Sequence, residues 1–312
     1  MQINVLKQIG NTPLVRLKQP SELTGCNIYG KAEYFNPGGS VKDRAALFIV
    51  KKAIENKEIE KGGTVVEGSA GNTGIGLAVV CKEYDLKLKI VIPDSQSIEK
   101  KNLLKKLGAE LIEVPPAPYS SSSNYIKQSK KIFESLRKEN NGGVIWANQF
   151  DNLENMNSHI QTTSNEIWTQ TAGKIDAFIC SVGTGGTLAG TSEGLKQKNK
   201  NIQIALSDPM GSSLFSFIKK NKLESSGSSI TEGIGTGRIT KNFDKAIIDD
   251  AFQVTDIEAL NIVFDMIKNQ NIVLGGSSGV NIAGAIKLAK KMGPGSNIVT
   301  ILCDDGRRYA SK

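Results

Sequence analysis

The chain has 312 residues, of which 39% are hydrophobic and 22% charged, and its formal net charge is +8. This composition is typical of a folded globular protein of about two domains, and it excludes a disordered chain. Because the lysines are scattered and aromatic residues make up only 6%, the charge favours small anionic molecules over nucleic acid.

Short apolar segments alternate with helical patterns along the chain. In the first half we expect strands at 27–32, 64–67, 86–93, 110–114 and 144–147. Helices are expected from Lys42 onward and at 73–84, 98–107, 124–139 and 153–171. The last of these is polar, and we expect the chain to cross there from one α/β lobe to the other.

The second half continues the same rhythm. We expect strands at 176–181, 202–206, 251–254 and 298–302, and helices ending near Lys198 and at 256–269 and 278–292. Residues 207–250 look less regular. This βαβ order predicts an α/β fold with parallel sheets covered on both faces by helices. No apolar window approaches about 18 residues and the first residues do not resemble a signal peptide, so we expect no membrane span.

The cysteine and histidine residues limit the kinds of catalytic site that this chain can form. The four cysteines are far apart and form no CxxC pair, so we expect no metal site and interpret them as reduced thiols of a cytoplasmic protein. His159 is the single histidine, and we interpret it as a structural or surface residue. Proton transfer is therefore expected to use a lysine or a carboxylate.

A lysine at a helix start is the most unusual feature. The turn Asn36-Pro37-Gly38-Gly39 runs into an apolar helix pattern, which places Lys42 in the first helical turn. The helix N-terminus carries partial positive charge and disfavours a second one, so it helps to keep the amine neutral. A neutral amine is a nucleophile, although most lysines at such positions are merely solvated.

Three glycine-rich loops follow predicted strands or begin helices. Ser69-Ala70-Gly71-Asn72-Thr73-Gly74 offers small residues, hydroxyls and amides that suit a carboxylate, and Gly183-Thr184-Gly185-Gly186-Thr187 offers successive N–H groups that suit a phosphate. The third, Gly275 to Gly279, reads by itself as a helix-capping turn. In open α/β sheets such loops gather beyond the carboxyl ends of the strands.

A nicotinamide-dependent oxidoreductase is a rival interpretation. Gly74-Ile75-Gly76 opens a helix after a strand, and Asp94 ends the next strand where a ribose-binding acid would stand. Val79 occupies the third glycine position, which weakens this pattern. A lysine, a phosphate cradle and a near-absence of histidine together point instead to pyridoxal phosphate.

At this point the chain resembles the cysteine synthase (O-acetylserine sulfhydrylase) and cystathionine β-synthase family of fold-type-II pyridoxal-phosphate enzymes. The matching motifs cover essentially the whole chain and are Asn11–Val15, Asn36–Arg44, Gly71–Gly74, Thr162-Thr163, Glu166–Trp168, Gly183–Leu188, Gly233–Gly235, Ser277–Gly279 and Gly306–Tyr309. The resemblance implies a tryptophan-synthase-β-like fold with two three-layer α/β/α lobes. Residues 1–38 plus 152–312 would form a larger cofactor-anchoring domain, and 39–151 a smaller mobile domain with the substrate loop.

The resemblance also implies a role for each site residue. Lys42 would hold the cofactor as a Schiff base and then act as general base, Asn72 would bond the cofactor ring, and Ser277 would face its nitrogen. Gly183, Thr184, Gly185, Gly186 and Thr187 would hold the phosphate. The substrate would be gripped by Ser69, Gly71, Asn72, Thr73 and Gln149, with Gly233 beside it. Ala70 stands where many relatives have serine, which removes one hydrogen bond to the substrate.

By the same resemblance, the reaction is β-replacement of O-acetylserine by sulfide, giving cysteine and acetate. A homodimer and a serine acetyltransferase partner are implied. Cystathionine β-synthase chemistry, joining serine to homocysteine, is the nearest alternative. Serine or threonine dehydration and a catalytically silent homologue stay open at this stage.

Overall fold

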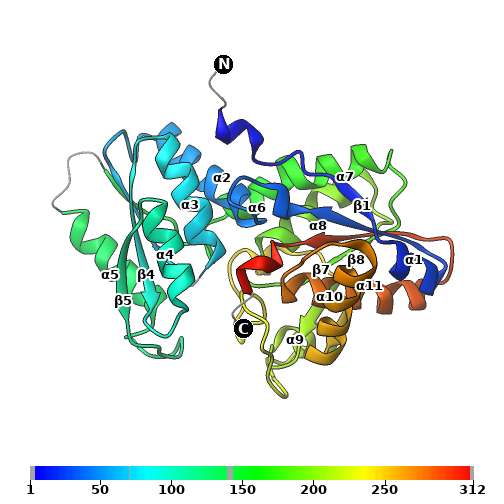
Figure 1. Ribbon diagram of the computed structural model, residues 1–312. Helices are drawn as coiled ribbons and strands as arrows, with labels where there is room; N and C mark the ends of the chain where they lie inside the picture. The colour runs from blue at the N-terminus through cyan, green and yellow to red at the C-terminus, as the bar shows by residue number, and fades with distance from the viewer. Residues whose placement is uncertain (1–3, 70, 139–142, 310–312) are drawn as a thin grey trace. The chain divides into compact units, whose positions relative to one another are not determined.

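The computed structural model describes residues 4–69, 71–138 and 143–309, which form two compact units. Unit 1 contains the described residues up to Ile9 together with Asn36–Asn155. Unit 2 contains Gly10–Phe35 and the described residues from Met156 onward. Each unit has its own sheet with helices on both sides (Figure 1), so the predicted α/β class with largely parallel sheets is confirmed.

The sheet of unit 1 has the order β5-β4-β3-β6, and its described pairings are all parallel. The strands are β3 (Thr64–Gly68), β4 (Lys87–Pro93), β5 (Glu110–Val114) and β6 (Val144–Trp146). The helices are α2 (Lys42–Glu55), α3 (Asn72–Glu83), α4 (Ile98–Lys106) and α5 (Tyr125–Leu136), and a 3₁₀ turn η1 (Val5–Gln8) precedes them. In Figure 1, α5 lies on one side of β4 and β5, and α3 and α4 lie on the other.

The sheet of unit 2 has the order β1-β2-β10-β7-β8-β9, and only the β1–β2 pair is antiparallel among these described strands. The strands are β1 (Leu14–Arg16), β2 (Asn27–Ala32), β7 (Ala177–Cys180), β8 (Gln203–Pro209), β9 (Asp250–Val254) and β10 (Asn297–Leu302). The helices are α1 (Lys18–Thr24), α7 (Ser164–Gln170), α8 (Gly186–Lys198), α9 (Leu214–Lys220), α10 (Asp256–Gln270) and α11 (Gly276–Met292).

Buried apolar strands explain why the sheets lie inside each unit. Every residue of β3 and of β7 is buried, which is the pattern of a parallel strand covered on both faces. α11 packs between the sheet and α10, and α10 begins with a capping box in which Thr255 and Glu258 satisfy each other's backbone N–H groups.

Within the described residues, we find no helix long and apolar enough to cross a bilayer.

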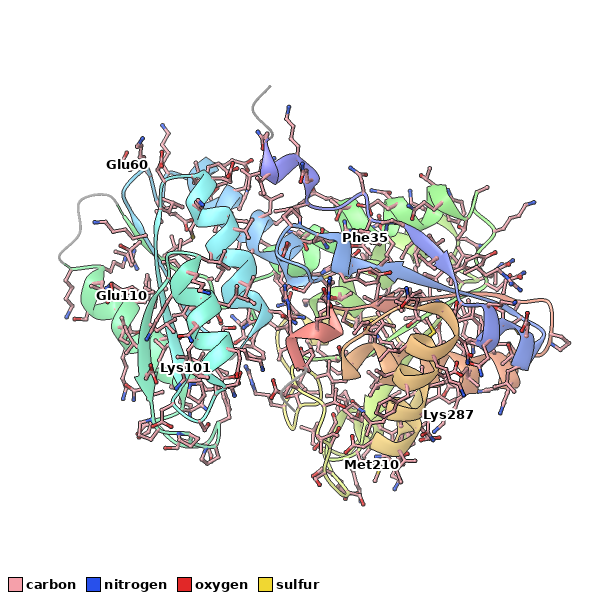
Figure 2. The ribbon with its side chains drawn as sticks, in the orientation of Figure 1. Phe35, Glu60, Lys101, Glu110, Met210 and Lys287 are labelled. Carbon is pink, nitrogen blue, oxygen red and sulfur yellow. The ribbon has the colours of Figure 1, made fainter. Side chains whose placement is uncertain are left out.

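Three local features of the fold were not predicted. The helix expected at 153–171 is present as a continuous helical run from Glu154 to Gln170, but its middle, η3 (His159–Thr163), is π-helical and separates α6 (Glu154–Ser158) from α7. β1, α1 and α9 were missed because each is too short to show a clear period. Lys101, in α4 and labelled in Figure 2, is buried despite its charge, and its ammonium donates to Glu113 Oε2 and Asp94 O at 2.6 Å each.

Candidate active site

In unit 1, Lys42 is the first residue of α2, as predicted, and it is half-buried. The turn before it is held by local hydrogen bonds. Gly39 adopts φ 71°, which favours glycine, and its N–H donates to Asn36 O at 2.7 Å. The Gly38 N–H donates to the Asp43 carboxylate in the first turn of the helix. The backbone that carries Lys42 is therefore fixed on both sides.

The start of α3 packs against the start of α2. A Cβ added at Gly76 would lie 3.1 Å from Asp43 Oδ1 and 3.2 Å from the Asp43 backbone N, so the two helices are in close contact here and a larger residue would have to push them slightly apart. Asn72 and Thr73 form the first turn of α3, whose N-cap residue is Gly71. The unit thus brings Lys42 near the predicted substrate loop. Gly74 and Gly76 lie inside α3 rather than in a tight strand-to-helix turn, so the dinucleotide interpretation is not favoured.

Ser69 braces the predicted substrate loop. Its Oγ accepts hydrogen bonds from the N–H groups of Gly71 and Gly74, each at 3.2 Å. The hydroxyl proton stays available for an outside acceptor such as a carboxylate. Ala70 lies outside the described residues.

Gln149 links the substrate loop to a buried carboxyl group. Thr73 Oγ1 donates to Gln149 Oε1 at 2.5 Å, and Gln149 Nε2 donates to Glu67 Oε1 at 3.2 Å. Glu67 lies in β3 and is 1% exposed, and its Oε2 has no hydrogen-bond partner among the described residues. Burial raises the pKa of Glu67 to about 8, although the hydrogen bonds from Gln149 lower it in part. The carboxyl group is therefore mostly protonated at neutral pH and orients the Gln149 amide.

Glu67 makes the stability of the protein depend on pH. Because its pKa rises from 4.5 in the unfolded chain to about 8 in the fold, its contribution is complete below pH 4.5 and is lost as the pH rises through 8. Glu67→Gln cannot ionise. The unfolding free energy of the wild-type protein should fall by about 5 kcal/mol between pH 4.5 and 8, at about 1.4 kcal/mol per pKa unit, and that of the variant should not show this fall. Denaturant titrations at several pH values measure this, with the exposed Glu60→Gln as control.

In unit 2, the predicted phosphate loop joins β7 to α8 and requires its glycines. A Cβ at Gly183 would lie 2.1 Å from Gly233 O. Gly185 has φ 92°, and a Cβ there would lie 2.5 Å from Phe243 N. The Gly235 N–H donates to Val182 O at 2.8 Å, which holds the 233–235 segment against the loop. Gly183 and Gly233, predicted separately, are therefore in contact.

The residues of this loop fit a phosphate group. α8 begins at Gly186 after the N-cap Gly185, which has no side chain to cap it, and the Gly186 N–H donates to Thr184 Oγ1 at 3.4 Å. The N–H groups of its first turn point out of the helix end, where the helix dipole also favours an anion. The glycines leave room for the anion to approach the backbone, and Thr187 adds a half-buried hydroxyl. A phosphate thus finds donors and space at one helix end.

Ser277 lies in the first turn of α11 and is 8% exposed. Its hydroxyl makes no hydrogen bond to other described residues, unlike that of Ser278, which accepts from the Cys303 N–H at 2.8 Å. One turn later, Asn281 accepts from the Ser181 N–H at 2.7 Å and donates to Ile301 O at 2.7 Å. Asn281 thus ties the start of α11 to the ends of β7 and β10, beside the phosphate loop.

Sequence reasoning missed three residues that support the site. Glu67 and Asn281 are polar side chains inside buried segments, and the charge within the strand Thr64–Gly68 was an available signal for the first. His159, expected to be structural or on the surface, is 1% exposed. Its ring contacts the phosphate loop, because its Nε2 lies 3.2 Å from Thr187 Oγ1.

Comparisons with known proteins agree on one family. A family model described as pyridoxal-phosphate dependent enzyme matches residues 5–304. The chain is 48% identical over 309 residues to cysteine synthase 1 of Neurospora crassa, covering 97% of this chain and 81% of that protein. It is 49% identical over 309 residues to cysteine synthase 1 of Emericella nidulans, covering 97% and 82%.

A solved structure from Helicobacter pylori, an O-acetylserine dependent cystathionine β-synthase, superposes with a TM-score of 0.88. Its sequence is 31% identical, and the match covers 100% of this chain and 99% of that one. The similarity therefore extends over both units.

Proposed function

The chain belongs to the family of pyridoxal-phosphate-dependent enzymes, and on that premise we propose that it is a cysteine synthase. The reaction would convert O-acetyl-L-serine and sulfide into L-cysteine and acetate. The observation that carries this proposal is the similarity, at 48% and 49% identity over almost the whole chain, to two cysteine synthases.

The residues of both units support the assignment of roles. We assign Lys42 as the residue that carries the cofactor and moves the proton at the substrate α-carbon. Asn72 and Ser277 would bond the cofactor ring, and the loop from Gly183 to Thr187 would hold its phosphate. The start of α8 after a glycine N-cap and the close contacts at Gly183 and Gly185 support that last role.

Substrate binding is assigned to the loop at the start of α3. The hydroxyls of Ser69 and Thr73, the amides of Asn72 and Gln149 and the backbone at Gly71 would bind the α-carboxylate, with Gly233 beside the substrate. Glu67 supports this assignment because its buried carboxyl group accepts a hydrogen bond from the Gln149 amide and so fixes the orientation of that amide. The division into a larger domain (1–38 and 152–312) and a smaller mobile domain (39–151) belongs to the same proposal, and it differs from the two compact units in that the described residues up to Ile9 group with Asn36–Asn155.

When bound, pyridoxal phosphate supplies the electron sink that allows a proton and a β-substituent to leave an amino acid. Ser277 offers a neutral hydroxyl rather than a carboxylate, so it does not force protonation of a ring nitrogen. A moderate sink suits β-elimination, in which acetate carries the electron pair away. Sulfide then forms the new bond to the β-carbon, and Lys42 returns a proton to the α-carbon.

A half-reaction tests the proposal without the second substrate. With O-acetylserine alone, a double-displacement enzyme should release acetate in a burst of about one equivalent per active site. Quench-flow measurement of acetate checks this, and sulfide added afterwards should produce one equivalent of cysteine. Acetate released only when sulfide is present would contradict the scheme.

We also propose that the protein is a homodimer. α10 carries an apolar stripe at helical spacing, Ile257, Leu260, Phe264 and Ile267, and the exposed fractions of Ile257 and Phe264 are 73% and 66%. An exposed stripe of this kind is typical of a protein interface. By the same resemblance we propose a cytoplasmic location, to which the free cysteines are suited, and serine acetyltransferase as a partner.

Phe264→Asp is expected to dissociate the dimer, because it places a charge in the centre of the proposed apolar interface. Sedimentation equilibrium should show the mass fall by half at micromolar concentration. Ile230→Asp is the matched control, since Ile230 is 70% exposed but lies outside the stripe. A wild-type protein that sediments as a monomer would contradict the proposal.

A further inference from the structure

The single histidine connects the π-helical turn to the phosphate loop. His159 Nδ1 lies 2.8 Å from Thr163 Oγ1, and His159 Nε2 lies 3.2 Å from Thr187 Oγ1. His159 and Thr163 are 1% and 0% exposed. They stand at the two ends of η3, and π-helical turns frequently occur at functional sites.

Close packing of α8 fixes this arrangement. A Cβ at Gly190 would lie 2.2 Å from Met156 O and 2.7 Å from His159 Cβ. A Cβ at Gly194, one turn later, would lie 2.1 Å from Ser164 Oγ. These glycines let α8 pack closely against Met156 before η3 and Ser164 after it, and the imidazole reaches the first turn of the same helix.

Hydrogen-bond satisfaction determines which ring nitrogen carries the proton. The Thr163 hydroxyl makes no other hydrogen bond to the described residues. If Nδ1 carried a proton, Thr163 would have to accept it, and its own buried proton would lack an acceptor, which is costly. If Thr163 instead donates to Nδ1, every polar atom of the pair is satisfied. The proton then sits on Nε2.

We propose that His159 is a positioning residue of the phosphate site, with its Nε2–H donating to Thr187 Oγ1. The Thr187 hydroxyl then accepts from His159, so its proton is left to donate to an oxygen of the cofactor phosphate. With the other tautomer, Thr187 would donate to His159 and present only lone pairs to an anion. The inference rests on the proposed function only through the family's cofactor, not through the amino-acid substrate.

Nitrogen NMR tests the tautomer directly. Because the chain has one histidine, ¹⁵N-histidine labelling gives unambiguous ring signals from the holoprotein. We expect a protonated Nε2 and an unprotonated Nδ1, and the Nε2 signal should move when the cofactor is removed. A protonated Nδ1, in the neutral or the charged ring, would overturn the inference.

Two substitutions separate positioning from packing. In His159→Gln the side-chain amide nitrogen replaces Nε2 and still reaches Thr187, whereas in His159→Asn it replaces Nδ1 and does not. Both variants lose the ring, and thermal unfolding of the apoproteins controls for that loss. The Kd for pyridoxal phosphate should rise about tenfold in His159→Asn and stay within about twofold of wild type in His159→Gln, as expected for one lost hydrogen bond.

A double-mutant cycle completes the test. His159→Asn should have no further effect on the Kd in a Thr187→Val background. Equal effects of the asparagine and glutamine variants, or additive effects with Thr187→Val, would overturn the inference. Cofactor affinity does not depend on the amino-acid substrate, so a protein that shows these affinities but makes no cysteine would refute the proposed function alone.

Discussion

Lys42→Ala is expected to lower the turnover of O-acetylserine and sulfide by about 10³-fold or more, the usual scale for losing a group that transfers protons. The variant loses both the covalent attachment point and the base at the α-carbon. Steady-state kinetics at saturating cofactor measures the loss. Lys51→Ala is a suitable control, because Lys51 lies on the same helix with its side chain 59% exposed.

Borohydride reduction of the wild-type protein followed by peptide mapping gives an independent readout. The reduced cofactor should be found on the peptide that contains Lys42. Recovery of the label on any other lysine would contradict the assignment, whatever the activity of the variant.

Gly185→Ala is expected to raise the Kd for pyridoxal phosphate by about 100-fold or more, on the scale of several lost charge-assisted hydrogen bonds. Gly185 has φ 92°, and its new Cβ would lie 2.5 Å from Phe243 N. The loop must move away from Phe243, which displaces the N–H groups at the start of α8. Spectroscopic titration of the apoprotein with pyridoxal phosphate measures the effect.

Gly295→Ala separates backbone strain from displacement of the loop. Gly295 also has φ 92° and lies in the same unit, but a Cβ there meets nothing within 4 Å. This variant should lose about 1–2 kcal/mol of stability, because alanine is strained in the left-handed region, and keep its cofactor affinity. Equal losses of affinity in the two variants would mean that the loop does not bind the phosphate.

The main elements of the fold were predictable because their signals are local. Buried parallel strands such as β3 and β7 read as short apolar runs, and the glycine turns that follow them are visible in the residue types. The start of α2 at Lys42 followed from the turn before it. Short elements such as α9, and the interruption of a helix by η3, depend on tertiary packing that leaves no period in the sequence.

The site residues were predicted from contiguous motifs or, for Gln149, from the family resemblance, whereas the side chains that support them were not. Lys42, the substrate loop and the phosphate loop are contiguous stretches whose residue types suit their proposed ligands. Glu67 and Gln149 are 82 positions apart and His159 and Thr187 are 28 apart, so the residues behind those stretches had no common pattern. These pairs come into contact only because the fold places particular strand ends and helix starts next to each other.

Product formation from alternative substrate pairs tests the central claim most directly. The cofactor-loaded protein should be given O-acetylserine or serine as donor and sulfide or homocysteine as acceptor, in all four combinations, with products quantified by mass spectrometry. A cysteine synthase should turn over O-acetylserine with sulfide fastest and release cysteine and acetate in equal amounts. Faster formation of cystathionine with homocysteine, from either donor, or no cysteine at all, would contradict the account.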